Sequence, residues 1–185
     1  MSILPEYEKL LFSARAKQKE NKTFLHKLKK QNPTDLDIVT NDFHDEAFKK
    51  IDCLKCANCC STSGPLFKNR DIDKLSAELK MRSSQFTDKY LHVDEEGDWV
   101  LNSLPCSFLG KDNYCTVYSA RPNACREFPH TQMRNIVAKL PITFLNSMIC
   151  PAVAQVVEDL KGHYIKKGPI YRTDQSSGKF SKSKN

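Results

Sequence analysis

Four cysteines lie within one stretch of eight residues, and this stretch is the part of the sequence whose spacing most clearly indicates chemistry. It reads Cys53-Leu54-Lys55-Cys56-Ala57-Asn58-Cys59-Cys60, and four further cysteines follow at Cys106, Cys115, Cys125 and Cys150. Cysteines that serve only as small core residues are not gathered so densely. Because thiolates bind zinc and iron–sulfur clusters, the pattern predicts a metal site.

The spacing within this stretch should bring three sulfurs together. Side chains three residues apart fall on the same side of a helical turn, so Cys53, Cys56 and Cys59 are expected to converge. Cys60 follows Cys59 directly and must point elsewhere, so it either faces a second metal or closes the same site from another side. The eight thiols divide most simply into two sets of four, and one cluster with spare cysteines is the alternative.

Two familiar cysteine patterns do not fit this chain. In a ferredoxin run, three residues and then a Cys-Pro pair follow the third cysteine, whereas here Cys60 follows at once and the Cys-Pro pair is Cys150-Pro151. Structural zinc sites use two short cysteine pairs, which the widely spaced downstream cysteines do not match. The spacing alone leaves iron–sulfur clusters and zinc both open.

The compartment decides how the cysteines are interpreted. Residues 1–9 show no basic start followed by an apolar run, so we expect no secretory signal. The most apolar region, 136–157, is interrupted by Lys139 and two prolines, so we expect no membrane span. We therefore predict a soluble, cytoplasmic protein. Metal-bound thiolates persist in that reducing compartment, whereas the alternative, a secreted protein with four disulfides, needs an oxidising one.

The charge distribution argues against nucleic acid as the partner. The formal net charge is +7, but residues 1–30 and 161–185 together carry +11 and the middle of the chain carries −4. These basic ends have no interleaved aromatic residues and no nucleic-acid motif, so we expect a solvated helix and tail that could contact a protein partner.

The sequence identifies no small-molecule substrate. It has no glycine-rich phosphate loop, no paired carboxylates in a cleft pattern and no nucleophile motif. A metal-dependent modifying enzyme, or an accessory to one, therefore ranks behind a binding protein.

The elements that must position the cysteines are mostly helical. Helical periodicity and capping signals predict helices over about 7–30, 35–50, 69–79 and 84–91, a short helix near Arg121-Pro122, and a final helix that opens at Cys150-Pro151. The turn 94–98 predicts one short β-hairpin. We expect a mainly α fold, a small helical domain with one hairpin and a loop-rich cysteine-ligated metal centre.

Three regions are expected along the chain. Residues 1–34 form a charged N-terminal helix or arm, 35–161 the cysteine-cluster metal-binding domain, and 162–185 a basic, aperiodic tail that we predict to be disordered.

The cysteine motifs together resemble a known family. They comprise Cys53-x-x-Cys56-x-x-Cys59-Cys60, Pro105-Cys106-Ser107-Phe108-Leu109, Cys115-Thr116-Val117-Tyr118, Arg121-Pro122 and Cys125-Arg126-Glu127-Phe128-Pro129. Over about residues 50–155 the chain resembles the YkgJ-type cysteine-cluster (CxxCxxCC) family of bacterial proteins, whose domain is described as zinc- or iron-chelating and often labelled iron–sulfur. The larger flagellin lysine methylase has a related cluster, but this chain is much shorter and its activity is not carried over.

The resemblance implies a ligand set. By it, all eight cysteines are the metal ligands: Cys53, Cys56, Cys59, Cys60, Cys106, Cys115, Cys125 and Cys150. Arg121 and Arg126 are expected to support them by donating hydrogen bonds and offsetting thiolate charge, and Phe108, Tyr118 and Phe128 are expected to exclude water. His130 is an alternative ligand, whereas the lone helical His44 is left out.

The preferred functional hypothesis is an iron–sulfur protein that transfers electrons or senses redox state. The first alternative is a zinc-binding structural or interaction module.

Overall fold

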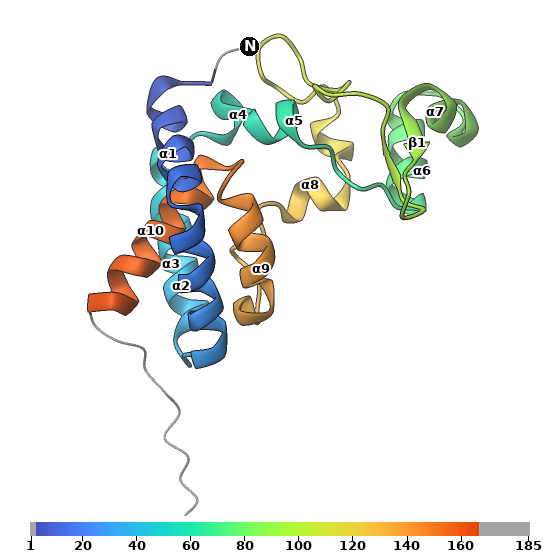
Figure 1. Cartoon of the computed structure of the whole chain (residues 1–185). Coiled ribbons are helices and arrows are strands. Elements are labelled where there is room, and N and C mark those ends of the chain that lie inside the picture. The colour runs from blue at the N-terminus through green and yellow to red at the C-terminus, as the bar shows by residue number, and fades with distance from the viewer. Residues whose placement is uncertain (1–2, 167–185) are drawn as a thin grey trace, which may run out of the picture.

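Helices supply nearly all the regular structure of the computed structural model, which describes residues 3–166. The expected mainly α fold with one short β-hairpin is confirmed. Figure 1 shows one group of helices at one side and a smaller group with the hairpin at the other. The hydrophobic residues form two separate clusters that match these two groups.

The larger cluster is built by five helices. They are α1 (Pro5–Ala16), α2 (Gln18–Gln31), α3 (Leu36–Lys50), α9 (Ile136–Asn146) and α10 (Pro151–Lys166). Four apolar residues of α10 at helical spacing, Val153, Val156, Val157 and Leu160, are fully buried in it. α10 packs mainly against α3 and α1, while α2 packs against α9. Helix α10 therefore forms the centre of this group.

Two of these helices differ from the sequence expectation. The single helix expected over 7–30 is two helices, which meet at Lys17 (φ −96°, ψ 18°). On either side of this break, α1 packs against α10 and α2 packs against α9. The interrupted apolar stretch after Ile136 is the continuous helix α9, which accommodates Pro141 at an exposed position.

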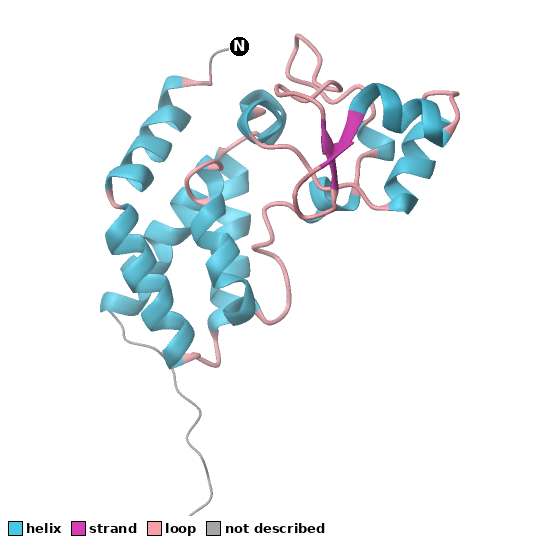
Figure 2. Cartoon of the chain, turned by 45° about the vertical axis from the view of Figure 1, so that its right-hand side comes forward, coloured by secondary structure: helices cyan, strands magenta, loops and turns pink. Residues whose placement is uncertain are grey.

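The smaller cluster lies under the hairpin. It is built by α6 (Asn69–Glu78), α7 (Ser83–Tyr90), β1 (Leu91–Val93) and β2 (Trp99–Leu101), with β1 and β2 antiparallel (Figure 2). The register pairs Leu91 with Leu101, which puts both on the buried face. Phe86 of α7 is fully buried and stacks on Phe108, with ring centroids 6.0 Å apart. The loop after Cys106 is therefore packed onto this cluster.

The cysteine-bearing segments connect the two groups. They include α4 (Cys53–Cys56), α5 (Asn58–Thr62) and α8 (Asn123–Glu127), which Figure 1 shows between the groups. The 3-10 turn η1 (Tyr118–Ala120), between Cys115 and Cys125, packs against α6. Among residues 3–166, none of the helices has the length and apolar character needed to span a membrane. α10 includes the first five residues of the predicted tail, and the remainder, 167–185, lies outside the described residues.

Helix α1 is attached to two segments that precede cysteines. The backbone amide of Asp52, next to Cys53, donates to the Tyr7 hydroxyl at 3.0 Å. The Arg15 guanidinium donates through Nε to the carbonyl of Met148, two residues before Cys150, at 3.1 Å. Helix α1 thus contacts the segments that lie directly before Cys53 and Cys150.

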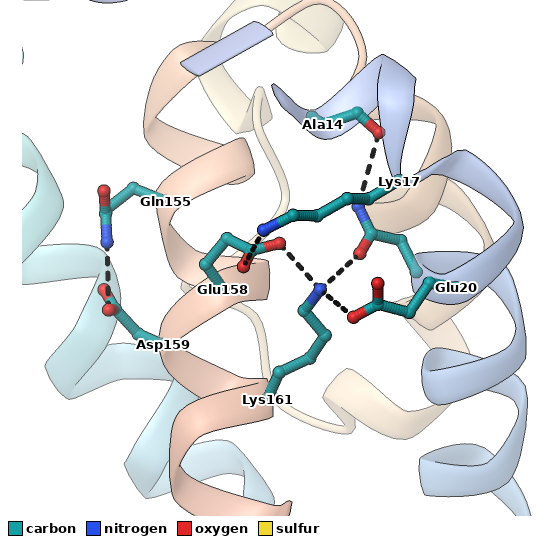
Figure 3. A network of polar contacts seen from close by, with 8 residues as sticks. Ala14, Lys17, Glu20, Gln155, Glu158, Asp159 and Lys161 are labelled. Atoms are coloured by element: carbon teal, nitrogen blue, oxygen red, sulfur yellow. Dashed lines mark hydrogen bonds and ion pairs between the residues drawn. The ribbon is translucent and has the colours of Figure 1, made fainter. Parts of the chain in front are cut away.

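A buried lysine ties α10 to α2 (Figure 3). The side chain of Lys161 is only 6% exposed, and its Nζ lies 2.6 Å from Glu20 Oε1, 2.9 Å from Asn21 Oδ1 and 2.8 Å from Glu158 Oε1. Desolvation by itself would lower the pKa of Lys161, but the hydrogen bonds to Glu158 and Glu20 raise it. The ammonium group is therefore charged, and it donates hydrogen bonds to Glu20 and Asn21 while it forms an ion pair with Glu158.

We predict that Lys161→Met destabilises the protein by about 2 kcal/mol, because Asn21 and Glu158 lose their buried donor while Glu20 can return to water. Lys17→Met is the matched control: Lys17 pairs with the same Glu158 at 3.1 Å but is 43% exposed, so its loss should cost less than about 1 kcal/mol. Urea unfolding measures both. Equal losses in the two variants would show that burial does not strengthen the Lys161 network.

We predict that Tyr7→Phe loosens the start of the cysteine loop, because the Asp52 amide loses its acceptor, at a cost of about 1 kcal/mol. Amide hydrogen exchange should become faster at Asp52. Tyr114→Phe, which changes a tyrosine that is 52% exposed, is the control. Unchanged protection at Asp52 in Tyr7→Phe would contradict the attachment.

Candidate metal centre

Two short helices with a left-handed residue between them shape the dense cysteine stretch. Asp52 caps α4, where its Oδ1 accepts from the amides of Leu54 at 3.0 Å and Lys55 at 3.4 Å. Ala57 then adopts φ 44°, ψ 15°, a conformation that costs a non-glycine residue about 1–2 kcal/mol. The chain turns at Ala57, so α5 starts in a new direction before Cys59.

The first set of thiols surrounds one small cavity. Cys53, Cys56, Cys59 and Cys150 all line a cavity of about 40 Å³. Its other walls are mostly apolar and include Phe48, Ile51, Phe128, Pro129, Pro151 and Ala152. Burial raises the pKa of Cys150 to about 12, and the charges of Cys53 and Cys56 add to this effect. Cys53, Cys56 and Cys59, which were expected to converge, share this cavity with Cys150, but no three of these side chains lie close enough together to hold a metal ion.

Asn58 helps to bring Cys150 into this set. Its side-chain amide donates to the carbonyl of Ile149, the residue before Cys150, at 2.6 Å. Sequence reasoning missed this residue because its partner lies 91 positions away, and no local pattern indicates such a contact.

The second set gathers around Cys60. The amide of Cys106 donates to the carbonyl of Cys60 at 2.8 Å, and Cys115 pairs with Leu109 in an isolated antiparallel bridge. Burial is the main reason why the pKa of Cys125 is raised to about 12, and the charges of Cys60, Cys106 and Cys115 raise it further. The charge of Cys60 also raises the pKa of Cys106 and of Cys115, after burial. These four thiols therefore lie within electrostatic reach of one another.

The two sets pack against different hydrophobic clusters. Cys56 and Cys150 contact the larger cluster, whereas Cys106 and Cys115 contact the smaller one. Cys59 and Cys60 join the sets, with their Sγ atoms 3.9 Å apart. This contact lowers the pKa of Cys60 to about 7 and raises that of Cys59. Cys60 thus loses its proton more readily than an ordinary cysteine.

Backbone amides point at several of the thiols. The amide of Asn58 donates to Cys56, those of Phe108 and Leu109 to Cys106, that of Val117 to Cys115, and those of Ala152 and Val153 to Cys150. Each of these contacts lowers the pKa of its thiol and opposes the larger effect of burial. Cys150 receives its amides at the first turn of α10, where free N–H groups favour negative charge. The backbone thus favours thiolate at these positions.

The two arginines have different surroundings. The guanidinium of Arg121 stacks over the Tyr118 ring at 3.8 Å, and its charge lowers the pKa of Cys53, Cys115 and Cys125 against the larger effect of burial. It therefore acts on thiols of both sets. Arg126 is exposed and donates through Nε to the carbonyl of Arg121 at 3.3 Å. Arg126 supports the backbone at Arg121.

The aromatic residues expected to exclude water also differ. Phe108 is buried and Phe128 lines the first cavity, whereas Tyr118 is 51% exposed and contacts Arg121. Tyr118 therefore positions a cation at the surface of the site.

Neither His130 nor His44 lines the first cavity. His130 follows Pro129 with φ 65°, and burial lowers its pKa. His44, which was left out of the site, is buried; its Nδ1 lies 2.6 Å from Thr131 Oγ1 and its ring stacks on Phe48 with the ring centroids 4.3 Å apart. Phe48 is a wall of the cavity, so His44 packs behind that wall.

The donor chemistry fits a thiolate-bound metal. Eight cysteine sulfurs, seven of them in partly buried residues and several with amide donors, are the kind of ligand that zinc and iron–sulfur clusters use. Within residues 3–166, no three Cys, His, Asp or Glu side chains already converge closely enough to hold a metal ion. Binding of a single ion would therefore draw the sulfurs further together.

Comparison with known proteins agrees with the motifs. No solved structure matches the chain. Residues 52–148 match the CxxCxxCC family, described as a putative zinc- or iron-chelating domain, and this match supports metal binding. The match covers more than half of the chain and seven of its eight cysteines, and it ends two residues before Cys150. The protein therefore belongs to the CxxCxxCC family of zinc- or iron-chelating domains.

Proposed function

We propose that this protein binds metal at two adjacent four-cysteine sites. The first site is formed by Cys53, Cys56, Cys59 and Cys150, and the second by Cys60, Cys106, Cys115 and Cys125. The observation that carries this proposal is that the first four thiols line one cavity, which the other four do not line. The charges of Cys60, Cys106 and Cys115 all act on Cys125, and the charge of Cys60 also reaches Cys53 and Cys56, so the two sites adjoin. Their packing against different hydrophobic clusters supports the same division.

We further propose that the metal is iron, held in iron–sulfur clusters with an electron-transfer or redox-sensing role. Such clusters accept and release single electrons, and their potentials depend on burial, hydrogen bonds to sulfur and nearby charge. The chain supplies all three influences through its apolar walls, its backbone amides and Arg121. Because Cys59 and Cys60 are consecutive, the two sites would share a short covalent path.

Zinc is the second candidate. The first cavity, of about 40 Å³, would need to expand less for a single ion than for a cluster. A zinc-loaded protein would be a structural or interaction module, because zinc stabilises folds without redox chemistry.

We predict that anaerobically purified protein contains iron and acid-labile sulfide and shows visible absorption that is lost reversibly on reduction. Cys150→Ser and Cys115→Ser should each lose about half of the metal and retain the rest, because each removes a ligand from a different site. Metal analysis and visible spectroscopy measure both results. A colourless protein with stoichiometric zinc would support the zinc module, and complete metal loss in both variants would argue for one shared site.

We predict that Arg121→Gln lowers the reduction potential by on the order of tens of millivolts, because a cation near the thiolates stabilises the more negative reduced state. Arg126→Gln is the matched control, since that side chain bonds only a backbone carbonyl, and its potential should stay unchanged. Potentiometric titration measures both proteins. Equal potentials in Arg121→Gln and the unmodified protein would exclude an electrostatic role for Arg121.

A further inference from the structure

A second and larger depression adjoins the first cavity. It has a volume of about 570 Å³ and lies between the start of α1 and the junction of α3 with α4. It is lined by Leu4, Glu6, Tyr7, Phe48, Lys49, Lys50, Ile51, Asp52, Cys53 and Lys55, and we call it the α1 basin. Phe48, Ile51 and Cys53 also line the cavity of the first site. The basin and the first site therefore share a wall.

Cys53 is the thiol at this shared wall, and it differs from the other seven. It is exposed, whereas the other seven cysteines are only partly exposed. Cys53 also lines the cavity of the first site, together with Cys56, Cys59 and Cys150. Cys53 thus belongs to the first site and also faces the basin.

The size of the basin suits a small molecule. Small-molecule sites in proteins commonly have volumes of about 300–1,000 Å³, and the α1 basin lies within this range. Its residues are mainly polar, in contrast to the apolar walls of the first cavity.

The charges around the basin favour an anion. Three lysines and two carboxylates line it. Asp52 is already engaged by two backbone amides and by Lys55 at 3.7 Å. Lys49 pairs with Glu46 outside the basin, and Lys50 forms no ion pair among residues 3–166. Lys50 is therefore the basin lysine that an incoming negative charge can engage without breaking an ion pair, although its charge also acts on Asp159 of α10 and Glu6 lines the same basin.

We propose that the α1 basin binds a small anionic metal chelate, such as a polycarboxylate complex, and that its metal passes to the first site at Cys53. A bond between the metal and Cys53 Sγ forms as a bond between the metal and a carrier oxygen breaks, and the thiol proton passes to the released carboxylate or to water. No electron is transferred. This inference rests on the proposed function because it assigns the entry route of the first site.

Cobalt uptake tests whether metal enters through the basin. Apo protein is mixed anaerobically with Co²⁺ supplied as its citrate complex, and thiolate-to-cobalt absorption is followed with time. Glu6→Trp, which fills the basin with an indole, should slow uptake at least about fivefold at unchanged final cobalt content. Glu8→Trp makes the same change on the exposed face of the same helix and outside the basin, and it should behave as the unmodified protein. Equal rates in both variants would overturn the entry route.

The charge of the basin is tested by a reaction that needs no metal. Alkylation of Cys53 in apo protein is measured by mass spectrometry with iodoacetate, an anion, and with iodoacetamide, which is neutral. Lys50→Glu should lower the iodoacetate-to-iodoacetamide rate ratio at Cys53 several-fold, and Lys22→Glu, with the same charge change elsewhere on the surface, should not. An unchanged ratio in Lys50→Glu would overturn the anion assignment.

The two experiments distinguish this inference from the proposed function. If the protein takes up no cobalt but Lys50→Glu changes the alkylation ratio, the four-cysteine sites are wrong and the basin is an anion site only. If cobalt binds at two equivalents and both basin variants behave as the controls, the sites stand and the entry route fails.

Discussion

The adjacency of Cys59 and Cys60 is the constraint on which the arrangement depends. Neighbouring side chains leave the backbone in different directions, and although the two Sγ atoms lie 3.9 Å apart, only Cys59 lines the small cavity. Here Cys59 faces the cavity that Cys150 completes, and Cys60 lies beside Cys106, Cys115 and Cys125. The two hydrophobic clusters are divided in the same way, because Cys56 and Cys150 contact the larger one and Cys106 and Cys115 contact the smaller one. Two residues thus join the two halves of the fold.

Electrostatics explains why such a structure needs its metal. Most of the thiols are partly buried, and burial raises the pKa of Cys150 and Cys125 to about 12. Without metal, most of these sulfurs therefore hold their protons. Backbone amides and Arg121 partly offset this effect, but they cannot compensate eight thiolates. Bound cations supply the remaining positive charge, and for this reason metal binding and folding should be coupled.

The helices outside the family match complete the first site. The match ends before Cys150, yet Cys150 lines the same cavity as Cys53 and Cys56. Helix α1 contacts the segments that precede Cys53 and Cys150 through Tyr7 and Arg15. Lys161 then ties α10 to α2. The charged N-terminal region, expected as a solvated helix or arm, thus packs against the body and supports the site.

The sequence by itself determined the chemistry and most of the elements. The CxxCxxCC spacing indicates a thiolate metal site because it is local. Helical periodicity located α3 and α10, whose apolar residues face the larger cluster, and α6 and α7, whose apolar residues face the smaller one. Only the tertiary structure decided which residues distant in sequence contact each other. Asn58 meets Ile149 across 91 residues, and His44 meets Thr131 across 87. Such contacts depend on how helices pack, and packing leaves no periodic signal in the chain. The break at Lys17 also belongs to the tertiary structure, because α1 before it packs against α10 and α2 after it packs against α9.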